Sequence, residues 1–453
     1  MAEADDTIVA IATPPGRGGL GIVRVSGNNS GSIARSLTGK NLAEKARIAH
    51  YCKILDADNS VIDKGIALFY SKPDSYTGED VLEIIAHGSR VVLDTIVNRI
   101  LTLGARRAGP GEFTERAFHN NKIDLVQAEA VADLIESTST HAARSAVRSL
   151  EGEFSGRINL LKDELIQIRS LIEGALDFPE EETDFLADMD IKNQLQRCIA
   201  RLDEILVRAQ QGAVLKEGIT ATILGRPNVG KSTLLNRLAE KDIAIVTEEA
   251  GTTRDLLEQE ILIDGLPVHL IDTAGLRQTT NKVEIEGTRR AREAATRSDI
   301  VLIMMECGVN DNSQLTELAQ DITDDQKVVI IKNKIDLTGH GPERQSSNGR
   351  TEEIFLSAKT GEGIELLIDC LKEMAGIRDL FEDVFMARKR HIDALESTRN
   401  SIIEALNRHN QHNATELLAE DLRQAQQRLN EITGEFVTDD LLGEIFSRFC
   451  IGK

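Results

Sequence analysis

The sequence predicts a multidomain protein of mixed class: an α/β domain at the N-terminus, a helical domain, and a second α/β domain inserted into the helical one. Three observations predict this. A phosphate-loop pattern at 225–232 follows a strand-like run and precedes a helical one. Long helical patterns lie on both sides of residues 218–377, and strand-like and helical runs alternate within residues 1–120. The 453 residues are enough for several separate cores.

Residues 1–120 form the first predicted domain, whose apolar and β-branched periodicity is typical of an α/β fold. We expect strands at 7–12, 21–25, 65–70 and 81–86, and a helix at 91–103. The glycine-rich run at 14–19 is a weak signal, because no Gly-Lys-Ser/Thr follows it.

The helical domain is predicted in two parts, 121–217 and 378–453. Apolar residues recur at helical spacing over 124–150, 158–176, 191–207, 387–407 and 415–432. Pro179, in an acidic run, ends the second of these helices. Since the helical pattern resumes after residue 377, residues 218–377 are predicted to be an insertion. Within them we expect residues 336–350 to form a surface loop.

The segment at 219–236 predicts a nucleoside triphosphate site. The pattern Gly225-x-x-x-x-Gly230-Lys231-Ser232 lies between a β-branched run and an amphipathic one. Glycines let backbone N–H groups face a phosphate chain, and the N-terminal end of the new helix adds positive potential. We expect Lys231 to reach the terminal phosphates and Ser232 to hold Mg²⁺.

Three further motifs follow in order and predict guanine as the base. Asp272-Thr273-Ala274-Gly275 follows a strand-like run and suits Mg²⁺ binding through water and sensing of a γ-phosphate. Asn333-Lys334-Ile335-Asp336 follows another strand-like run. The Asp336 carboxylate can accept hydrogen bonds from the N1–H and the 2-amino group of guanine. Adenine lacks both donors, so ATP is disfavoured. Ser357-Ala358-Lys359 fits the loop behind the base.

The first switch segment is predicted at 251–255, with Thr253 as the second side-chain ligand of Mg²⁺. Leu276 stands where many regulatory GTPases carry the glutamine that orients the attacking water. Leucine cannot do this, and Glu284 is the candidate replacement. An exposed switch-helix glutamate with no role is the alternative that the residues alone favour.

Composition excludes several function classes. The net charge of −21 and the pI of about 5.0 argue against a broad electrostatic grip on nucleic acid. The five cysteines form no Cys-x-x-Cys pair, so neither a zinc site nor a disulfide framework is indicated. The N-terminus has no signal-peptide pattern, and no apolar run reaches the length of a membrane span. We therefore expect a cytoplasmic protein with no membrane partner.

Over its whole length the chain resembles the MnmE (TrmE) family of tRNA-modification GTPases. The resemblance implies a folate-binding-like N-terminal domain and a Ras-like G domain inserted in the helical domain. The matching motifs are Ala12-Thr-Pro-Pro-Gly-Arg-Gly-Gly, Gly111-Glu-Phe-Thr-Glu-Arg-Ala-Phe, Asp124-Leu-Val-Gln-Ala-Glu-Ala-Val, Gly225-Arg-Pro-Asn-Val-Gly-Lys-Ser and the tail Phe449-Cys-Ile-Gly-Lys453.

For the G domain, the resemblance implies hydrolysis that depends on K⁺ and on two G domains meeting face to face. The implied K⁺ ligands are Asn228, Thr247, Glu249 and Thr252, and the ion neutralises charge between the β- and γ-phosphates. Glu284 falls on the family's catalytic glutamate. The implied GTP-binding set is Asn228, Val229, Gly230, Lys231, Ser232, Thr233, Thr247, Glu248, Glu249, Ala250, Gly251, Thr252, Thr253, Asp272, Thr273, Ala274, Gly275, Asn333, Lys334, Asp336, Ser357, Ala358 and Lys359.

For the N-terminal domain, the resemblance implies a constitutive homodimer and a site for 5-formyl- or methylene-tetrahydrofolate. The matching positions are Arg24, Glu83, Lys122 and Lys453. Glu83 suits the N–H donors of a pterin, while Arg24 and the lysines suit the ligand's oxygens. Asn121 stands where a glycine is common, and asparagine tolerates a left-handed turn.

The resemblance also implies a partner protein, the flavin- and NADH-dependent MnmG, in a heterotetramer. The two together add a carboxymethylaminomethyl or aminomethyl group to C5 of the wobble uridine of certain tRNAs. Cys450, in the C-terminal tail, is a candidate either for a chemical role or for packing.

Two alternatives stay open. One is a regulatory GTPase of the ribosome-assembly kind, which shares the G motifs and does no one-carbon chemistry. The other is a stand-alone folate-dependent aminomethyltransferase whose G domain serves assembly. No flavin or nicotinamide loop is recognisable in the sequence, which favours an enzyme of two proteins over the second alternative.

Overall fold

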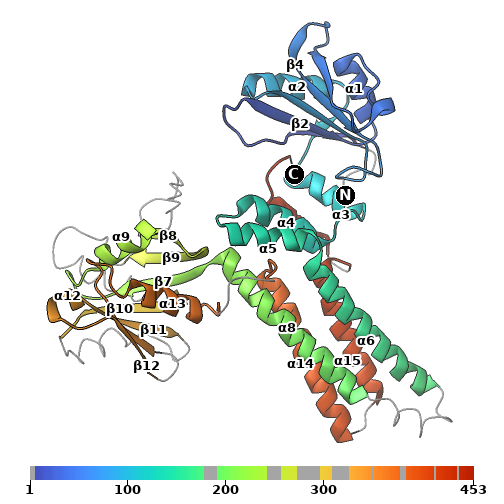
Figure 1. Ribbon diagram of the computed structural model, residues 1–453. Coiled ribbons are helices and arrows are strands. Elements are labelled where there is room, and N and C mark those ends of the chain that lie inside the picture. The colour runs from blue at the N-terminus through green and yellow to red at the C-terminus, as the bar shows by residue number, and fades with distance from the viewer. Residues whose placement is uncertain are drawn as a thin grey trace, which may run out of the picture. The chain divides into compact units, whose positions relative to one another are not determined.

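The computed structural model describes residues 6–177, 191–241, 257–272, 296–308, 326–347, 351–377, 384–412, 415–435 and 438–452. The chain divides into two compact units (Figure 1). The N-terminal unit comprises Met1–Ala132 and Gln426–Lys453, and the second unit comprises Asp133–Ala425. The N-terminal unit therefore takes residues from both ends of the chain.

A six-stranded sheet in the order β3-β4-β5-β2-β1-β6 forms the centre of the N-terminal unit. Neighbouring strands are antiparallel, except that β1 and β6 are parallel. Apolar side chains of α1 and α2 join those of one sheet face in a single core, as the alternation of buried residues along the strands requires. The elements are β1 (Ile8–Ile11), β2 (Leu20–Ser26), α1 (Ser30–Thr38), η1 (Ala43–Lys45), β3 (His50–Leu55), β4 (Val61–Tyr70), β5 (Val81–His87), α2 (Arg90–Thr102) and β6 (Arg106–Arg107).

The opposite face of this sheet carries an apolar row across four strands. Tyr51 on β3 is paired with Ile66 on β4, Ile66 with Ile85 on β5, and Ile85 with Ile22 on β2. Tyr51 is 70% exposed and Ile66 is 36% exposed. Four apolar residues in register on a partly exposed sheet face form the kind of patch that associates with another surface.

The C-terminal segment completes the N-terminal unit. The elements outside the sheet are α3 (Glu112–His119) and α16 (Asp439–Ser447), while α4 (Leu125–Glu136) and α15 (Thr415–Thr433) cross the boundary between the units. Phe446 and Phe449 share a buried cluster with Leu125, and Phe118 packs against it. Residues from α16 and the segment after it therefore share one core with residues of α4.

Long helices form one part of the second unit: α5 (Thr140–Leu150), α6 (Glu153–Asp177), α8 (Ile191–Glu217) and α14 (Lys389–His412). Helices α8 and α14 lie side by side, although the chain between them forms a separate sheet (Figure 1). The ring of Phe154 on α6 stacks on that of Phe385 at 4.4 Å between centroids.

The single helix predicted over 124–150 is wrong, because α4 and α5 are two helices. Ser139 caps the second one, since its hydroxyl accepts a hydrogen bond from the Ala142 N–H at 3.1 Å. A polar side chain that satisfies the first free N–H groups of a helix favours a new start at that point. The Ser-Thr-Ser-Thr run at 137–140 carried this signal.

A seven-stranded sheet in the order β12-β13-β11-β10-β7-β9-β8 forms the other part of the second unit. Its five central strands are parallel, and the two edge strands, β8 and β12, are antiparallel to their neighbours. Parallel strands bring their carboxyl ends to one edge, where ligands of such sheets bind. The elements are β7 (Ile219–Leu224), α9 (Lys231–Lys241), β8 (Leu257–Ile263), β9 (Leu266–Asp272), β10 (Ile300–Glu306), β11 (Lys327–Asn333), α12 (Ile335–Thr338), β12 (Glu343–Ser347), β13 (Thr351–Phe355) and α13 (Ile364–Met374).

The loop predicted at 336–350 is wrong in its described part. That stretch contains most of α12 and the edge strand β12, in which Glu343 is paired with Phe355. An edge strand with one side in solvent tolerates charged residues, so its composition resembles that of a loop. Among the described residues, no helix is long and apolar enough to cross a membrane.

Candidate functional sites

The phosphate loop joins β7 to α9 and requires glycine at two positions. The φ angles of Gly225 and Gly230 are +152° and +105°, which L side chains rarely adopt. A Cβ on Gly225 would lie 2.5 Å from the Met304 carbonyl oxygen, and one on Gly230 would lie 2.4 Å from Asn333 Nδ2. The glycines therefore let the loop pack closely against the ends of β10 and β11.

The side chains of the loop fit a phosphate chain and its cations. Lys231 is only 8% exposed, and its Nζ donates to the carbonyl oxygens of Gly225 and Arg226, the latter at 3.1 Å. Ser232, the second residue of α9, is exposed, so its hydroxyl can serve as a ligand of Mg²⁺. Asn228 is exposed at the loop tip with a φ of +65°, and its amide oxygen suits K⁺.

Asn333 connects the phosphate loop to the loop predicted behind the base. Its Nδ2 donates to the Val229 carbonyl oxygen at 2.7 Å, and its Oδ1 accepts from the Ala358 N–H at 2.9 Å. The side chain is 3% exposed, so both bonds lie in the interior. A buried amide with these bonds holds the two loops at a fixed separation.

Asp336 lies at the same edge of the sheet. It is exposed, and its Oδ1 accepts a hydrogen bond from Ser357 Oγ at 2.7 Å. Ser357 Oγ in turn accepts from the Thr360 N–H at 3.2 Å. The structure thus brings Asp336 and the Ser357–Lys359 motif together, as the sequence predicted for a guanine site.

Two residues that the sequence did not single out support this site. Lys334, with a φ of +70°, forms an ion pair with Glu306 at the end of β10. Arg237 on α9 donates to the carbonyl oxygens of Lys359 and Ala358 at 2.7 and 3.4 Å. Neither Glu306 nor Arg237 belongs to a short motif, so only the three-dimensional arrangement reveals them.

Several predicted residues lie outside the described part of the chain. Asp272 ends β9 at the expected edge, but its side chain is not described. The K⁺, Mg²⁺ and catalytic assignments for the switch segments stay predictions. The residues outside the description are Thr247, Glu248, Glu249, Ala250, Gly251, Thr252, Thr253, Thr273, Ala274, Gly275, Glu284 and Lys453.

A second candidate site lies on the N-terminal sheet, where Arg24 on β2 is directly opposite Glu83 on β5. Arg24 Nη2 and Glu83 Oε1 form an ion pair at 2.8 Å, with side chains 20% and 17% exposed. The guanidinium also lies over the rings of Tyr76 and Phe113, at 5.4 and 5.8 Å from their centroids. A half-buried carboxylate beside a stacked guanidinium fits the donors and acceptors of a pterin.

Two tyrosines, Tyr70 and Tyr76, lie beside this second site, and the sequence had given no sign of them. Burial raises the pKa of Tyr70, and the charge of Glu83 and a hydrogen bond to it raise the pKa further. Burial also raises the pKa of Tyr76, whose hydroxyl is 2.9 Å from Thr114 Oγ1. Both phenols therefore stay protonated at neutral pH and can donate a hydrogen bond.

The tail of the chain also reaches this site. Arg24 Nη1 donates to the Gly452 carbonyl oxygen at 3.4 Å, although the two residues are 428 positions apart. Lys122 Nζ instead donates to the Pro73 carbonyl oxygen at 3.0 Å, in the loop that carries Tyr76. Asn121 has a φ of +55°, which confirms the predicted left-handed turn before Lys122.

Cys450 differs from the buried cysteines. Burial raises the pKa of Cys198 to about 12 and that of Cys370 to about 11, and it also raises the pKa of Cys52. These three thiols are therefore poor nucleophiles at neutral pH. Cys450 is exposed and free, next to the tail residues that approach Arg24.

Comparison with known proteins identifies the family of this chain. The family description "GTP-binding protein TrmE N-terminus" matches residues 7–122, and "MnmE helical domain" matches residues 125–450. The tRNA modification GTPase MnmE of Legionella pneumophila (strain Corby) is 51% identical over 450 residues, covering 99% of each chain. The same-named protein of Hydrogenovibrio crunogenus is 51% identical over 100% of this chain and 99% of its own, and that of Pseudomonas aeruginosa is 50% identical over the whole of both. The chain therefore belongs to the MnmE family of tRNA modification GTPases.

Proposed function

We propose that this GTPase, together with the flavin-dependent protein MnmG, modifies C5 of the wobble uridine of certain tRNAs with a carboxymethylaminomethyl or aminomethyl group. One observation carries the proposal. The same chain has a guanine-nucleotide site at the edge of one sheet and, on another sheet, an Arg24–Glu83 site that its own C-terminal tail approaches. A purely regulatory GTPase has no use for the second site.

Hydrolysis of GTP is assigned to residues of the G domain. Lys231 and the loop N–H groups bind the phosphates, while Ser232 and Thr253 hold Mg²⁺. Asn228, Thr247, Glu249 and Thr252 would hold K⁺, which, with Mg²⁺, would supply positive charge beside the phosphates. Glu284 orients the attacking water, because Leu276 cannot.

Asp336 and the Asn333-mediated contact of the two loops select guanine. The Asp336 carboxylate is exposed at the mouth of the site, and Ser357 donates a hydrogen bond to one of its oxygens. Guanine supplies two N–H donors that a carboxylate can accept, and a base without them leaves the charge unpaired.

The Arg24–Glu83 site is assigned to 5-formyl- or methylene-tetrahydrofolate, which supplies a one-carbon unit when bound. Glu83 accepts from the amino and ring N–H groups of the pterin, and Arg24 donates to the ligand's oxygens. Lys122 and Lys453 complete the set of cations for the ligand's glutamate tail. The phenol of Tyr70 keeps its proton and shares a hydrogen bond with Glu83, so it helps to orient that carboxylate.

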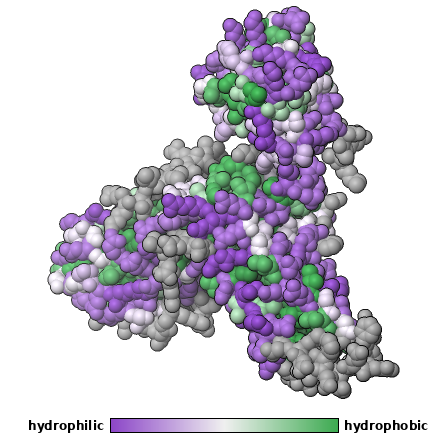
Figure 2. Space-filling model, turned by 45° about the vertical axis from the view of Figure 1, so that its right-hand side comes forward, coloured by the Kyte–Doolittle hydropathy of each residue, from purple (hydrophilic) through white to green (hydrophobic). Residues whose placement is uncertain are grey.

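A homodimer through the N-terminal unit is supported by the apolar row of Ile22, Tyr51, Ile66 and Ile85, since a second copy can cover it. Figure 2 shows hydrophobic residues gathered on one side of this unit. Arg24 and Glu83 lie on the same sheet face, two positions along β2 and β5 from Ile22 and Ile85. The proposed ligand site therefore adjoins the proposed dimer surface.

The remaining assignments concern partners and location. The chain has a net charge of −21, so we assign much of the tRNA binding to MnmG in the proposed heterotetramer. The redox chemistry also belongs to MnmG. Both proteins act where tRNA matures, in the cytoplasm.

The proposal is tested by a mass-spectrometric nucleoside profile of tRNA from cells that lack this protein. We expect the C5-aminomethyl-type wobble uridines to disappear and to return with the wild-type gene. An unchanged profile would favour a regulatory GTPase of the ribosome-assembly kind. Ribosome-subunit profiles from the same cells distinguish that outcome directly.

Substitution of Asn228 by alanine is expected to abolish the advantage of K⁺ over Na⁺ in GTP hydrolysis. Asn228 is exposed at the loop tip, so the change removes a ligand oxygen without opening a cavity. The measurement compares kcat in the two salts at matched ionic strength. A K⁺ advantage that survives in the variant would remove Asn228 from the ion site.

Substitution of Glu284 by alanine is expected to preserve GTP affinity and to lower kcat by about 100-fold or more, the size typical of a lost water-orienting group. Equilibrium binding of a fluorescent GTP analogue and single-turnover hydrolysis separate the two effects. The nearby Glu286→Ala variant serves as a control for the loss of a charge in the same segment. A kcat equal to that of the control would contradict the assignment.

A further inference from the structure

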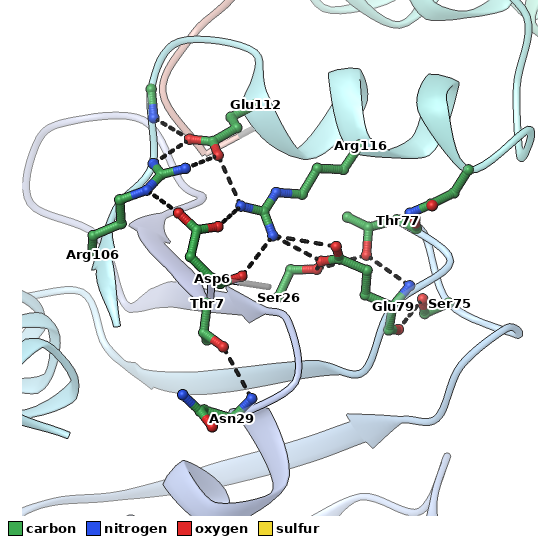
Figure 3. A network of polar contacts seen from close by, with 12 residues as sticks. Asp6, Thr7, Ser26, Asn29, Ser75, Thr77, Glu79, Arg106, Glu112 and Arg116 are labelled. Carbon is green, nitrogen blue, oxygen red and sulfur yellow. Dashed lines mark hydrogen bonds and ion pairs between the residues drawn. The ribbon is translucent and has the colours of Figure 1, made fainter. Parts of the chain in front are cut away.

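A partly buried ion network in the N-terminal unit is centred on the carboxylate of Glu112, the first residue of α3 (Figure 3). Its oxygens accept from Arg106 Nη1 and Nη2 at 2.8 and 2.5 Å, from Arg116 Nη2 at 3.0 Å, and from the Gly109 N–H at 2.8 Å. The Glu112 side chain is 9% exposed. One carboxylate with four donors is strongly stabilised in its charged form.

Arg116 extends the network to the sheet. Its guanidinium donates to Asp6 Oδ1 at 2.5 Å and to Glu79 Oε2 at 3.1 Å, and Glu79 also accepts from Ser26 Oγ at 2.7 Å. Arg106 contacts Asp6 as well. Two guanidiniums therefore lie among three carboxylates, and they join α3 to β6, to Asp6 before β1, to the end of β2 and to the loop at 75–79 (Figure 3).

The electrostatics agree with this geometry. Burial alone would raise the pKa of Glu112, but the hydrogen bonds from Arg106, Gly109 and Arg116 outweigh burial and lower the pKa to about 2. The Glu112 carboxylate therefore stays charged at every physiological pH. Removing Glu112 would take one carboxylate from the guanidinium of Arg116, whose side chain is only 13% exposed, and this is costly.

The Gly109 N–H that Glu112 binds belongs to the turn that contacts the C-terminal tail. Pro110 forms a β-bridge with Ile451, and the Gly111 N–H donates to the Cys450 carbonyl oxygen at 3.4 Å. Gly111 has a φ of +65°, and a Cβ there would lie 2.7 Å from the Phe446 carbonyl oxygen. The turn and the tail therefore contact each other through their backbones, and a side chain at position 111 would not fit.

The tail then reaches Arg24. The Gly452 carbonyl oxygen accepts from Arg24 Nη1, and a Cβ on Gly452 would lie 2.4 Å from the Ile11 carbonyl oxygen. Phe113, the residue after Glu112, supplies one of the rings beneath the Arg24 guanidinium. The position of α3 therefore affects Arg24 in two ways, through the ring of Phe113 and through the carbonyl oxygen of Gly452.

We propose that Glu112 is a positioning residue: by fixing the Gly109–Gly111 turn, it docks residues 450–452 and sets the end of the chain beside Arg24. The docking of the tail follows from these contacts alone. Its consequence for a folate ligand rests on the proposed function. Glu112 itself touches the turn and not the ligand site, so it acts through the backbone that it holds.

Hydrogen exchange of the C-terminal peptide in the full chain tests the proposal. In the Glu112→Gln variant we expect the amides of residues 446–452 to exchange about tenfold faster, because the docking turn has lost its charged anchor. Glu115→Gln is the matched control, since Glu115 lies on the same helix, its side chain is 37% exposed, and its ion pair with His119 is long, at 3.9 Å. Equal tail exchange in the wild type and in Glu112→Gln would overturn the proposal.

A second, milder variant tests the proposal in case Glu112→Gln fails to fold. Arg106→Lys keeps a positive charge but cannot form both bonds to Glu112, and Arg106 is 42% exposed, so the change is milder. Faster tail exchange with a normal thermal melting profile would support the docking role, whereas unchanged exchange in both variants would overturn it. Binding of 5-formyltetrahydrofolate is measured in parallel. Failure of the wild type to bind it would reject the folate assignment, while the exchange data would still decide the role of Glu112.

Discussion

The Asp336→Asn variant is expected to use GTP at least about 100-fold less efficiently than the wild type and to prefer xanthosine triphosphate. The Asp336 carboxylate presents two acceptors to guanine, whereas an asparagine amide presents one acceptor and one donor. Its NH₂ would face the 2-amino group of guanine, donor against donor, but it can donate to the 2-carbonyl of xanthine. The measurement is kcat/KM for the two nucleotides.

The fold of the site should survive this change. Ser357 Oγ donates to Asp336 Oδ1 at 2.7 Å, and an amide oxygen can accept the same bond. Asp369→Asn on α13 is the matched control, because its side chain is 60% exposed and its ion pair with Lys372 at 3.4 Å contributes little. The same preference for GTP in both variants would remove Asp336 from base recognition.

The Gly230→Ala variant is expected to lose GTP affinity by about 100-fold or more. Alanine at a φ of +105° strains the backbone, and its Cβ would lie 2.4 Å from Asn333 Nδ2. Asn333 would have to move and give up its bonds to Val229 and Ala358, which leaves buried polar groups unpaired. Both the phosphate loop and the base loop would shift. Equilibrium binding of fluorescent GDP and GTP analogues measures the loss.

Gly339→Ala separates the two causes. Gly339 also has a positive φ, of +70°, which is less strained for alanine, and nothing lies within 4 Å of a Cβ built there. We expect this control to lose a little thermal stability and to keep its nucleotide affinity. If Gly230→Ala bound GTP as well as Gly339→Ala, close packing against Asn333 would not matter for the site.

The nucleotide site was largely predictable because its chemistry needs particular residues at the carboxyl ends of successive strands. The apolar pattern already indicated β7 and β11, whose ends carry Gly225, Lys231, Asn333 and Asp336. As expected, Asn333 contacts the phosphate loop at Val229, and Asp336 contacts Ser357. The support from Arg237 was not predictable. It depends on a helix and a loop that are 121 positions apart meeting in space.

The second site shows the limit of sequence reasoning more clearly. Arg24 and Glu83 entered only through a family resemblance, since each is an ordinary charge on its own strand. Their ion pair depends on strand register over 59 positions, which periodicity alone does not fix. The rings of Tyr76 and Phe113 come from a loop and a helix with no local signal.

The two wrong secondary-structure predictions have local causes. A capping serine divided a run that keeps helical periodicity on both sides, and an edge strand had the polar composition of a loop. Hydrophobic periodicity is read over a window of many residues, so it did not reveal the Ser139 cap or the pairing of β12 with β13.

The joining of both chain ends in the N-terminal unit has a consequence for biosynthesis. At about 5–20 residues per second, a ribosome takes roughly 15–60 s to get from the first part of this unit to the second. During that interval Leu125 and Phe118 lack Phe446 and Phe449, which later pack with them, and so they form a target for chaperones. A nascent chain that stops early can fold a complete phosphate loop but leaves the Arg24 site unfinished. Premature termination would therefore release a nucleotide-binding protein that lacks the tail at its second site.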